Sequence, residues 1–299
     1  MINVEVREQQ KDVSVVYHYL RLIRPKQWIK NIYVFAVLFF SQGFFDLHNL
    51  LLNVVLFICF CCISSSVYVL NDISDIERDR NHPKKKYRPL ASGAISKTKA
   101  LFVMILLLII AFVLAGLLDL GVLFVIGFYF LLNIAYSFWF KHYVLVDCFI
   151  IAIGFMLRLI SGSVLFNIQP SSWIILCTFL LSLFLALNKR RSELVSVDQQ
   201  SGITRTNLMH YSVPLIDNLI TTVSSATFIS YCIYTLSASK HEYAVLTIIP
   251  VLYGIFRYQY LVVMKNYGGS VEETLLKDKT LLFSIAVWIV MNLVMLYLE

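Results

Sequence analysis

The chain has 299 residues, of which 59% are hydrophobic and only 14% are charged, and its mean hydropathy is +0.76. Soluble domains of this length are about half apolar and a quarter charged, so the composition argues against a soluble enzyme, a disordered chain and a secreted disulfide scaffold. The class that remains is a polytopic helical membrane protein, provided that the apolar residues form runs of about 20.

The apolar residues do form such runs. The predicted spans, in chain order, are 28–46, 50–70, 99–118, 121–140, 146–166, 172–188, 214–236, 243–264 and 280–298. None alternates apolar and polar residues as the strands of an outer-membrane barrel do. The sequence therefore predicts an all-α protein with nine transmembrane helices, forming a single integral membrane domain over residues 1–299.

Positive charge indicates how these helices are oriented. Nearly all of the 25 Lys and Arg residues lie in the N-terminal tail or in the even-numbered loops; Lys240, Arg158 and Arg257 are the exceptions. Because cationic loops stay in the cytoplasm, we expect a multi-pass protein of the inner (plasma) membrane. Its N-terminal tail (1–24) and the loop 71–98 would be cytoplasmic, and so would the active site. The net charge of +7 suits anionic lipids and substrates, and we expect no nucleic acid partner.

An acidic segment follows the second predicted span. If the helix continues past Leu70, Asp72, Asp75 and Asp79 lie at i, i+3 and i+7 on one face, with Asn71 beside them. Three carboxylates on one face repel one another unless a cation bridges them, and hard oxygen ligands favour Mg²⁺ shared with substrate phosphates. The alternative is a solvated helix end, although a simple membrane-flanking loop is expected to be basic throughout.

A basic run comes directly after the carboxylates, between two prolines that interrupt the helix. It consists of Lys84, Lys85, Lys86 and Arg88. An acidic metal-binding face beside a Lys/Arg cluster is what a diphosphate ester requires, because the metal bridges phosphoryl oxygens and the cations neutralise the remaining charge. The alternative is charge that serves only to orient the protein in the membrane.

Other polar residues stand near or within the spans. Lys30 precedes the first span, Tyr136 and Lys141 follow the fourth, and Lys189 ends the sixth. Asp147 and Arg158 are eleven residues apart and lie on nearly the same face of the fifth span. An intramembrane arginine is costly, so Arg158 should face a polar cavity or a partner. The alternatives are a membrane-surface anchor at Lys30 and a structural ion pair or a snorkelling side chain at Arg158.

Asn-Asp-x-x-Asp-x-x-x-Asp, at the end of the second of nine helices, resembles the first signature of the UbiA superfamily of intramembrane prenyltransferases. The resemblance implies a helical bundle around a central cavity that is open to the lipid for a polyprenyl tail.

The sequence looks most like one branch, the decaprenyl-phosphate phosphoribosyltransferases. The matching stretches are Arg24-Pro25-Lys26-Gln27-Trp28-Ile29-Lys30-Asn31, His82-Pro83-Lys84, Arg88-Pro89-Leu90-Ala91-Ser92-Gly93, Tyr136-Ser137 with Lys141, Gly154-Phe155-x-Leu157-Arg158 with Gly162, and Lys189-Arg190-x-x-Glu193-Leu194.

This branch implies transfer of a phosphoribosyl group from phosphoribosyl diphosphate (PRPP) to a polyprenyl phosphate such as decaprenyl phosphate, with release of diphosphate. Mg²⁺ would be held by Asp72, Asp75 and Asp79, and Asp72, Asp75 and Arg88 would be catalytic. The substrate-binding residues would be Asn71, Lys30, Lys84, Lys86, Tyr136, Lys141, Asp147, Arg158 and Lys189. Because the attacking phosphate is already an anion, no strong general base is needed, and alignment and charge stabilisation would supply most of the catalysis.

Two other functions are compatible with parts of the sequence. A UbiA-type polyprenyltransferase, moving a prenyl chain from its diphosphate to an aromatic acceptor, would use the same acidic face but should carry a second aspartate-rich motif, which the sequence does not show. A transporter with Arg158 and Arg257 on an anion path should show inverted repeats, and none is evident. A homo-oligomer is compatible with the sequence, which does not specify one.

Overall fold

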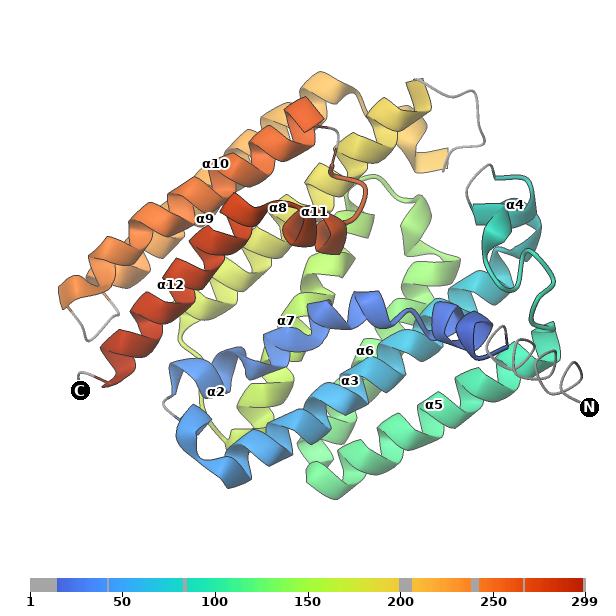
Figure 1. Ribbon diagram of the computed structural model, residues 1–299, viewed down its shortest axis with the longest axis horizontal. Helices are drawn as coiled ribbons and strands as arrows, with labels where there is room; N and C mark the ends of the chain where they lie inside the picture. The colour runs from blue at the N-terminus through green and yellow to red at the C-terminus, as the bar shows by residue number, and fades with distance from the viewer. Residues whose placement is uncertain are drawn as a thin grey trace, which may run out of the picture.

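The computed structural model describes residues 15–41, 43–82, 85–198, 206–237, 242–265 and 267–297, and all of the regular structure in these ranges is helical (Figure 1). Residues 15–23 are helical, and the α-helices that follow are α2 (Ala36–Phe40), α3 (Leu47–Ser74), α4 (Ile76–Arg80), α5 (Lys97–Leu118), α6 (Leu120–Phe138), α7 (Val146–Phe166), α8 (Ser172–Asp198), α9 (Val213–Ser237), α10 (Ile248–Lys265), α11 (Val271–Lys277) and α12 (Lys279–Tyr297). The 3-10 helices are η1 (Pro25–Phe35), η2 (Gly43–Phe45), η3 (Lys85–Tyr87), η4 (Phe140–His142), η5 (Thr206–His210) and η6 (Glu242–Thr247).

Seven of the described helices are long and apolar enough to cross a membrane, and they match the second to the eighth predicted spans. The last predicted span is α12, which together with α11 forms a pair bent by 92° that passes the same test. Large apolar side chains face outward along these helices, for example Leu117 (79% exposed) and Phe124 (76% exposed). An apolar perimeter of this kind is the surface that lipid covers.

The first predicted span, 28–46, differs from the expectation of one α-helix. Its residues form η1, the short helix α2 and η2. A 3-10 helix has three residues per turn, so Trp28, Asn31 and Val34 fall on one face, and Asn31 and Val34 are fully buried. Gly162 of α7 lies against this face, where a Cβ atom would come within 2.6 Å of the Val34 carbonyl oxygen. The segment is therefore shaped by close packing on α7, which hydropathy does not reveal.

Helix ends follow local capping rules. The Asp119 carboxylate accepts hydrogen bonds from the backbone N–H groups of Gly121 (2.7 Å) and Val122 (3.3 Å), so a single residue separates α5 from α6. The Asp46 carboxylate caps α3 in the same way. Side-chain oxygens of this kind satisfy N–H groups that the helix leaves unpaired, and they account for the short gap between the third and fourth predicted spans.

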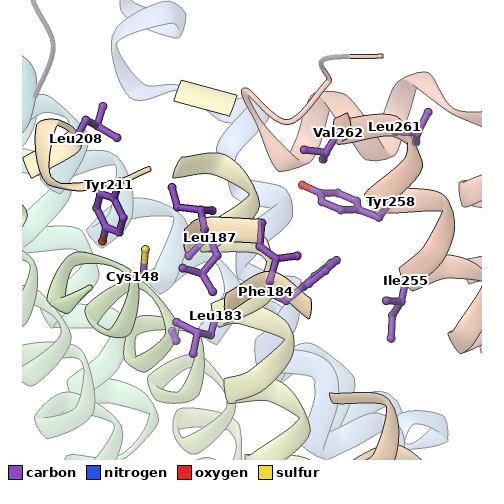
Figure 2. Packing of buried hydrophobic residues seen from close by; sticks show 14 of the residues in the cluster. Cys148, Leu183, Phe184, Leu187, Leu208, Tyr211, Ile255, Tyr258, Leu261 and Val262 are labelled. Carbon is purple, nitrogen blue, oxygen red and sulfur yellow. The ribbon is translucent and has the colours of Figure 1, made fainter. Parts of the chain in front are cut away.

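Three hydrophobic clusters form the interior of the described part of the chain, and α7 contributes to the two largest. One cluster joins η1, α3, α5, α6 and the middle of α7. The other joins the first turns of α7 to α8, α9 and α10, and Figure 2 shows its members Cys148, Phe184 and Tyr258. In Figure 1, α3 and α5 lie together on one side and α9, α10 and α12 on the other. Polar side chains gather where α3 ends and α5 begins, which we call the α4 end of the bundle.

Candidate active site

The α4 end brings together two of the predicted carboxylates. Asp72, in the last turn of α3, and Asp79, on α4, are 2% and 3% exposed. One nitrogen of Arg88, Nη1, donates to Asp72 Oδ1 at 3.0 Å and to Asp79 Oδ2 at 2.6 Å. Arg24 also donates to Asp72 Oδ1. Carboxylates from two helices therefore converge on one cationic atom, and two arginines share one carboxylate oxygen.

The helix does not continue unbroken through the acidic segment. It ends at Ser74, and α4 begins after Asp75. Asp72 and Asp79 nevertheless meet, whereas Asp75 pairs with Arg78 Nη2 at 2.5 Å and Lys141 Nζ at 3.4 Å. Within the described ranges, no three His, Cys, Asp or Glu side chains are grouped closely enough to hold a metal ion. The structure thus brings Asp72 and Asp79 together across a break between two helices, not on the single continuous face that the spacing predicts, and it leaves Asp75 with other partners.

Lys141 reaches Asp75 from η4, far along the chain. Burial by itself raises the pKa of the Asp75 carboxyl, but the charges of Lys141 and Arg78 outweigh it and hold the pKa below its usual value. Asp75 is therefore ionised at neutral pH. The sequence identified Lys141 as a site residue, and the structure places it against the acidic segment.

Arg24 is a site residue that the sequence reasoning did not select. It has a left-handed backbone conformation (φ 53°, ψ 61°) immediately before Pro25, a conformation that costs free energy in a residue other than glycine. Ser65 of α3 fixes both flanks, since its hydroxyl donates to the Ile23 carbonyl at 2.8 Å and accepts from Trp28 Nε1 at 2.9 Å. The Arg24 guanidinium also lies 5.1 Å from the centre of the Tyr68 ring. The sequence feature that could have drawn attention to Arg24 is its position directly before Pro25.

Three predicted substrate-binding residues lie elsewhere at this end. Lys30 is bound by Gln27 and lies 3.4 Å from Glu272 of α11. Lys86 is exposed, with its Nζ 5.2 Å from the centre of the Tyr87 ring. Asn71 is half-buried on α3, one residue before Asp72. A fourth, Lys84, falls outside the described residues.

A second polar cluster joins α6, α7 and α8. Asp147 is fully buried, and its Oδ2 accepts from Arg190 Nε at 2.5 Å. Arg190 also binds Glu193 and donates to the Tyr136 hydroxyl at 3.4 Å. Asp147 and Tyr136 were both predicted as substrate-binding residues, and the structure joins them through Arg190, which stands in one of the matching stretches of the sequence but was given no role there. Lys189 is half-buried beside Arg190 at the same end of α8.

Tyr211, just before α9, extends this cluster. Its hydroxyl accepts from the Leu145 backbone N–H at 2.6 Å and lies 3.5 Å from Asp147 Oδ1. Burial raises the pKa of the Tyr211 hydroxyl above its usual value, so this group remains protonated at neutral pH.

Arg158 lies in the middle of α7, away from both clusters. It is 5% exposed and donates to Asn31 Oδ1 (2.8 Å), the Gly154 carbonyl (2.7 Å) and the Tyr129 hydroxyl (2.9 Å). The rings of Phe60, Tyr129 and Phe155 surround its guanidinium, with centres within 5.6 Å. Among the described residues, Arg158 makes neither the ion pair nor the snorkelling contact considered as alternatives; it is a buried cation held by neutral groups.

Comparison with known proteins defines the class. Residues 32–272 match the UbiA prenyltransferase family, and the chain belongs to this family of membrane enzymes. A protein of Mycolicibacterium smegmatis named decaprenyl-phosphate phosphoribosyltransferase is 31% identical over 92% of this chain and 91% of its own length. A protein of Corynebacterium glutamicum with the same name is 29% identical over 95% of this chain and 88% of its own.

The fold agrees with this assignment. The structure of a UbiA homologue from Archaeoglobus fulgidus, bound to GPP and Mg²⁺, superposes with a TM-score of 0.72 at 19% identity, covering 94% of this chain and 99% of that one. In this chain the oxygens of Asp72 and Asp79 converge on the guanidinium of Arg88, so two hard oxygen donors, of the kind that Mg²⁺ prefers, already face one position.

Proposed function

We propose that this enzyme transfers the 5-phosphoribosyl group of PRPP to a membrane polyprenyl phosphate, such as decaprenyl phosphate, and releases diphosphate in an Mg²⁺-dependent reaction. The observation that carries the proposal is the similarity, along more than nine tenths of the chain, to two proteins named decaprenyl-phosphate phosphoribosyltransferase. Both substrates are phosphorylated, and a charged cluster of the kind found at the α4 end suits them.

Asp72 and Asp79 would hold Mg²⁺ together with Asp75, and Asn71 would assist them. The ion would supply electrophilic stabilisation of the departing diphosphate. Arg88 lies against both carboxylates, so it is placed to donate to phosphate oxygens bound at the same point. Lys84, Lys86 and Lys30 would neutralise the remaining phosphate charge, including the 5-phosphate of the ribose.

The second cluster would organise the acceptor side. The Asp147–Arg190 pair is buried and tightly bonded, so we assign Asp147 to shaping the site through Arg190 and Tyr136. Lys141 and Lys189 would attract the polyprenyl phosphate headgroup at the edge of the bundle. One oxygen of this headgroup attacks the anomeric carbon of the ribose while the bond to diphosphate breaks. The attacking oxygen is already anionic, which is why the reaction requires no strong base.

We also propose that η1 and α2 complete a ninth crossing, with the N-terminus and the α4 end in the cytoplasm of a cell whose inner membrane holds the protein. The 11 residues of η1 rise about 22 Å at about 2.0 Å each, and the five of α2 add about 8 Å. Together they match the roughly 30 Å hydrocarbon thickness of a bilayer. The basic residues of the tail and of loop 71–98 support this orientation.

The test uses the purified full chain in detergent with PRPP labelled in its ribose, a C50 or C55 polyprenyl phosphate and Mg²⁺. We expect label to enter the organic phase, and EDTA to abolish the transfer. If no label moves, but the same preparation consumes a prenyl diphosphate in the presence of an aromatic acceptor, the phosphoribosyl assignment is wrong and the protein is an ordinary prenyltransferase of its family.

A further inference from the structure

The charges at the α4 end do not suit a bare metal ion. Among the described residues, the three carboxylates Asp72, Asp75 and Asp79 are contacted by four cationic side chains. These are Arg24, Arg78, Arg88 and Lys141. The cluster therefore carries a net charge of +1 without any ligand, and a divalent cation entering alone meets carboxylates that are already neutralised.

The two arginines on Asp72 occupy the position that a metal ion requires. Arg88 Nη1 stands between Asp72 and Asp79, and Arg24 shares Asp72 Oδ1 with it. A metal bound by these oxygens forces both guanidinium groups to find other acceptors, since an arginine cannot lose its proton to become neutral. Diphosphate oxygens are suitable acceptors, because guanidinium binds phosphate in a bidentate manner.

The surroundings of Arg24 allow its guanidinium group to move from the carboxylate of Asp72 to a diphosphate oxygen. Its backbone is held on both flanks by Ser65, whereas its side chain is 24% exposed and rests on the Tyr68 ring. The aromatic face supports the guanidinium without competing for its donors. The backbone is thus fixed while the charged end can change partners.

We propose that Arg24 is a diphosphate-binding residue of this site, and that Arg24 and Arg88 pass from carboxylate to diphosphate when the metal and the diphosphate enter together. This inference rests on the proposed function and deepens it. It predicts that the site binds a metal–diphosphate complex much more tightly than either component alone, whichever group the diphosphate carries.

The test measures binding rather than turnover. Electron paramagnetic resonance of Mn²⁺, used in place of Mg²⁺, reports binding of the metal alone, and labelled pyrophosphate with excess Mg²⁺ reports binding of the complex. For Arg24→Gln we expect opposite changes: the affinity for Mn²⁺ alone rises several-fold, and that for pyrophosphate with Mg²⁺ falls about tenfold, the worth of one charge-assisted hydrogen bond. A purely structural role would weaken both.

The matched control is Arg80→Gln, which removes a guanidinium from α4 that pairs with the exposed Glu77 and not with the three aspartates. Neither affinity should change by more than twofold. If Arg24→Gln does not fold, Arg24→Lys, which keeps the charge but loses the bidentate geometry, should lower pyrophosphate affinity while leaving Mn²⁺ affinity near wild type. Any other combination of changes in the two affinities would show that Arg24 does not pass from carboxylate to diphosphate.

The result of this binding test does not depend on which substrate supplies the diphosphate. Pyrophosphate is the leaving group of PRPP and of a prenyl diphosphate alike, so failure of phosphoribosyl transfer would leave the exchange standing. Conversely, tight binding of Mn²⁺ alone that Arg24→Gln does not strengthen would disprove the exchange even if the enzyme transfers phosphoribosyl groups.

Discussion

Arg88 and Arg158 each donate hydrogen bonds within a polar cluster, but their surroundings differ. Arg88 is partly exposed at the α4 end and binds two carboxylates of the proposed metal site. Arg158 is buried in the bundle and binds an amide, a carbonyl and a hydroxyl between aromatic rings. A charge held by ions in a partly open site can exchange partners when a charged ligand enters. Arg158 is held by neutral groups in a closed site, so we expect it to keep its partners and to stabilise the packing of the helices around it.

The largest effect should come from the α4 end. Asp72→Asn keeps the shape of the side chain but removes the charge that metal binding requires, so transfer activity should fall about 100-fold or more. The amount of folded protein, measured by size-exclusion chromatography and circular dichroism, should not change. Near-normal activity would show that Asp72 does not bind the metal, and Asp75→Asn tests the second proposed ligand in the same assay.

Replacing the buried Arg158 should lower the stability of the fold, whereas Asp72→Asn should lower activity only. Arg158→Met leaves Asn31 and Tyr129 without their donor inside the bundle, and we expect a loss of about 2 kcal/mol in the free energy of unfolding, since buried groups left unpaired cost about this much. Arg80→Met is the matched control: this arginine pairs with Glu77 and both side chains are exposed, so their ion pair contributes at most about 1 kcal/mol. Equal losses would contradict the comparison.

A smaller change isolates one bond of the Arg158 cluster. Tyr129→Phe removes the hydroxyl that accepts from Arg158 Nη2 at 2.9 Å and keeps the ring that lies against the guanidinium. A typical hydrogen bond contributes about 1 kcal/mol, so the midpoint of thermal unfolding in detergent should fall slightly. The affinity for pyrophosphate with Mg²⁺ should change little, because the hydroxyl accepts its hydrogen bond from Arg158 and not from Arg24 or Arg88.

The smallest effect should be that of pH on the Asp75–Lys141 pair. Because the pKa of Asp75 is lowered in the folded protein, the pair stabilises the fold fully above the ordinary aspartate pKa of about 4. This contribution disappears as the pH falls through the lower folded value. Lys141→Met should therefore reduce stability by less than about 1 kcal/mol near pH 7, and the difference from wild type should vanish in acid. A difference that grows toward low pH would contradict the pairing.

Periodicity and charge were enough for most of the fold. Runs of apolar residues predict the positions of eight helical crossings because burial in lipid requires about 20 apolar residues in a row. The first predicted span was wrong in its local form, because Gly162 of α7 allows η1 to approach closely and a contact between distant segments has no signal in hydropathy.

The candidate site likewise has features that follow from local sequence and features that depend on contacts between distant segments. The sequence by itself determined the chemical character of the α4 end, because the i, i+3, i+7 spacing of aspartates and the basic run after them are local patterns. It also placed Arg158 within the membrane-spanning bundle.

Only the tertiary structure decided which charges meet. Arg24 reaches Asp72 across 48 residues of chain and Arg190 reaches Asp147 across 43, whereas Arg158, which shares a helix with Asp147, binds Asn31 instead. The physical reason is that an ion pair depends on where helices pack in space. Local sequence sets the face of one helix, and only the packing of several helices sets which faces oppose each other.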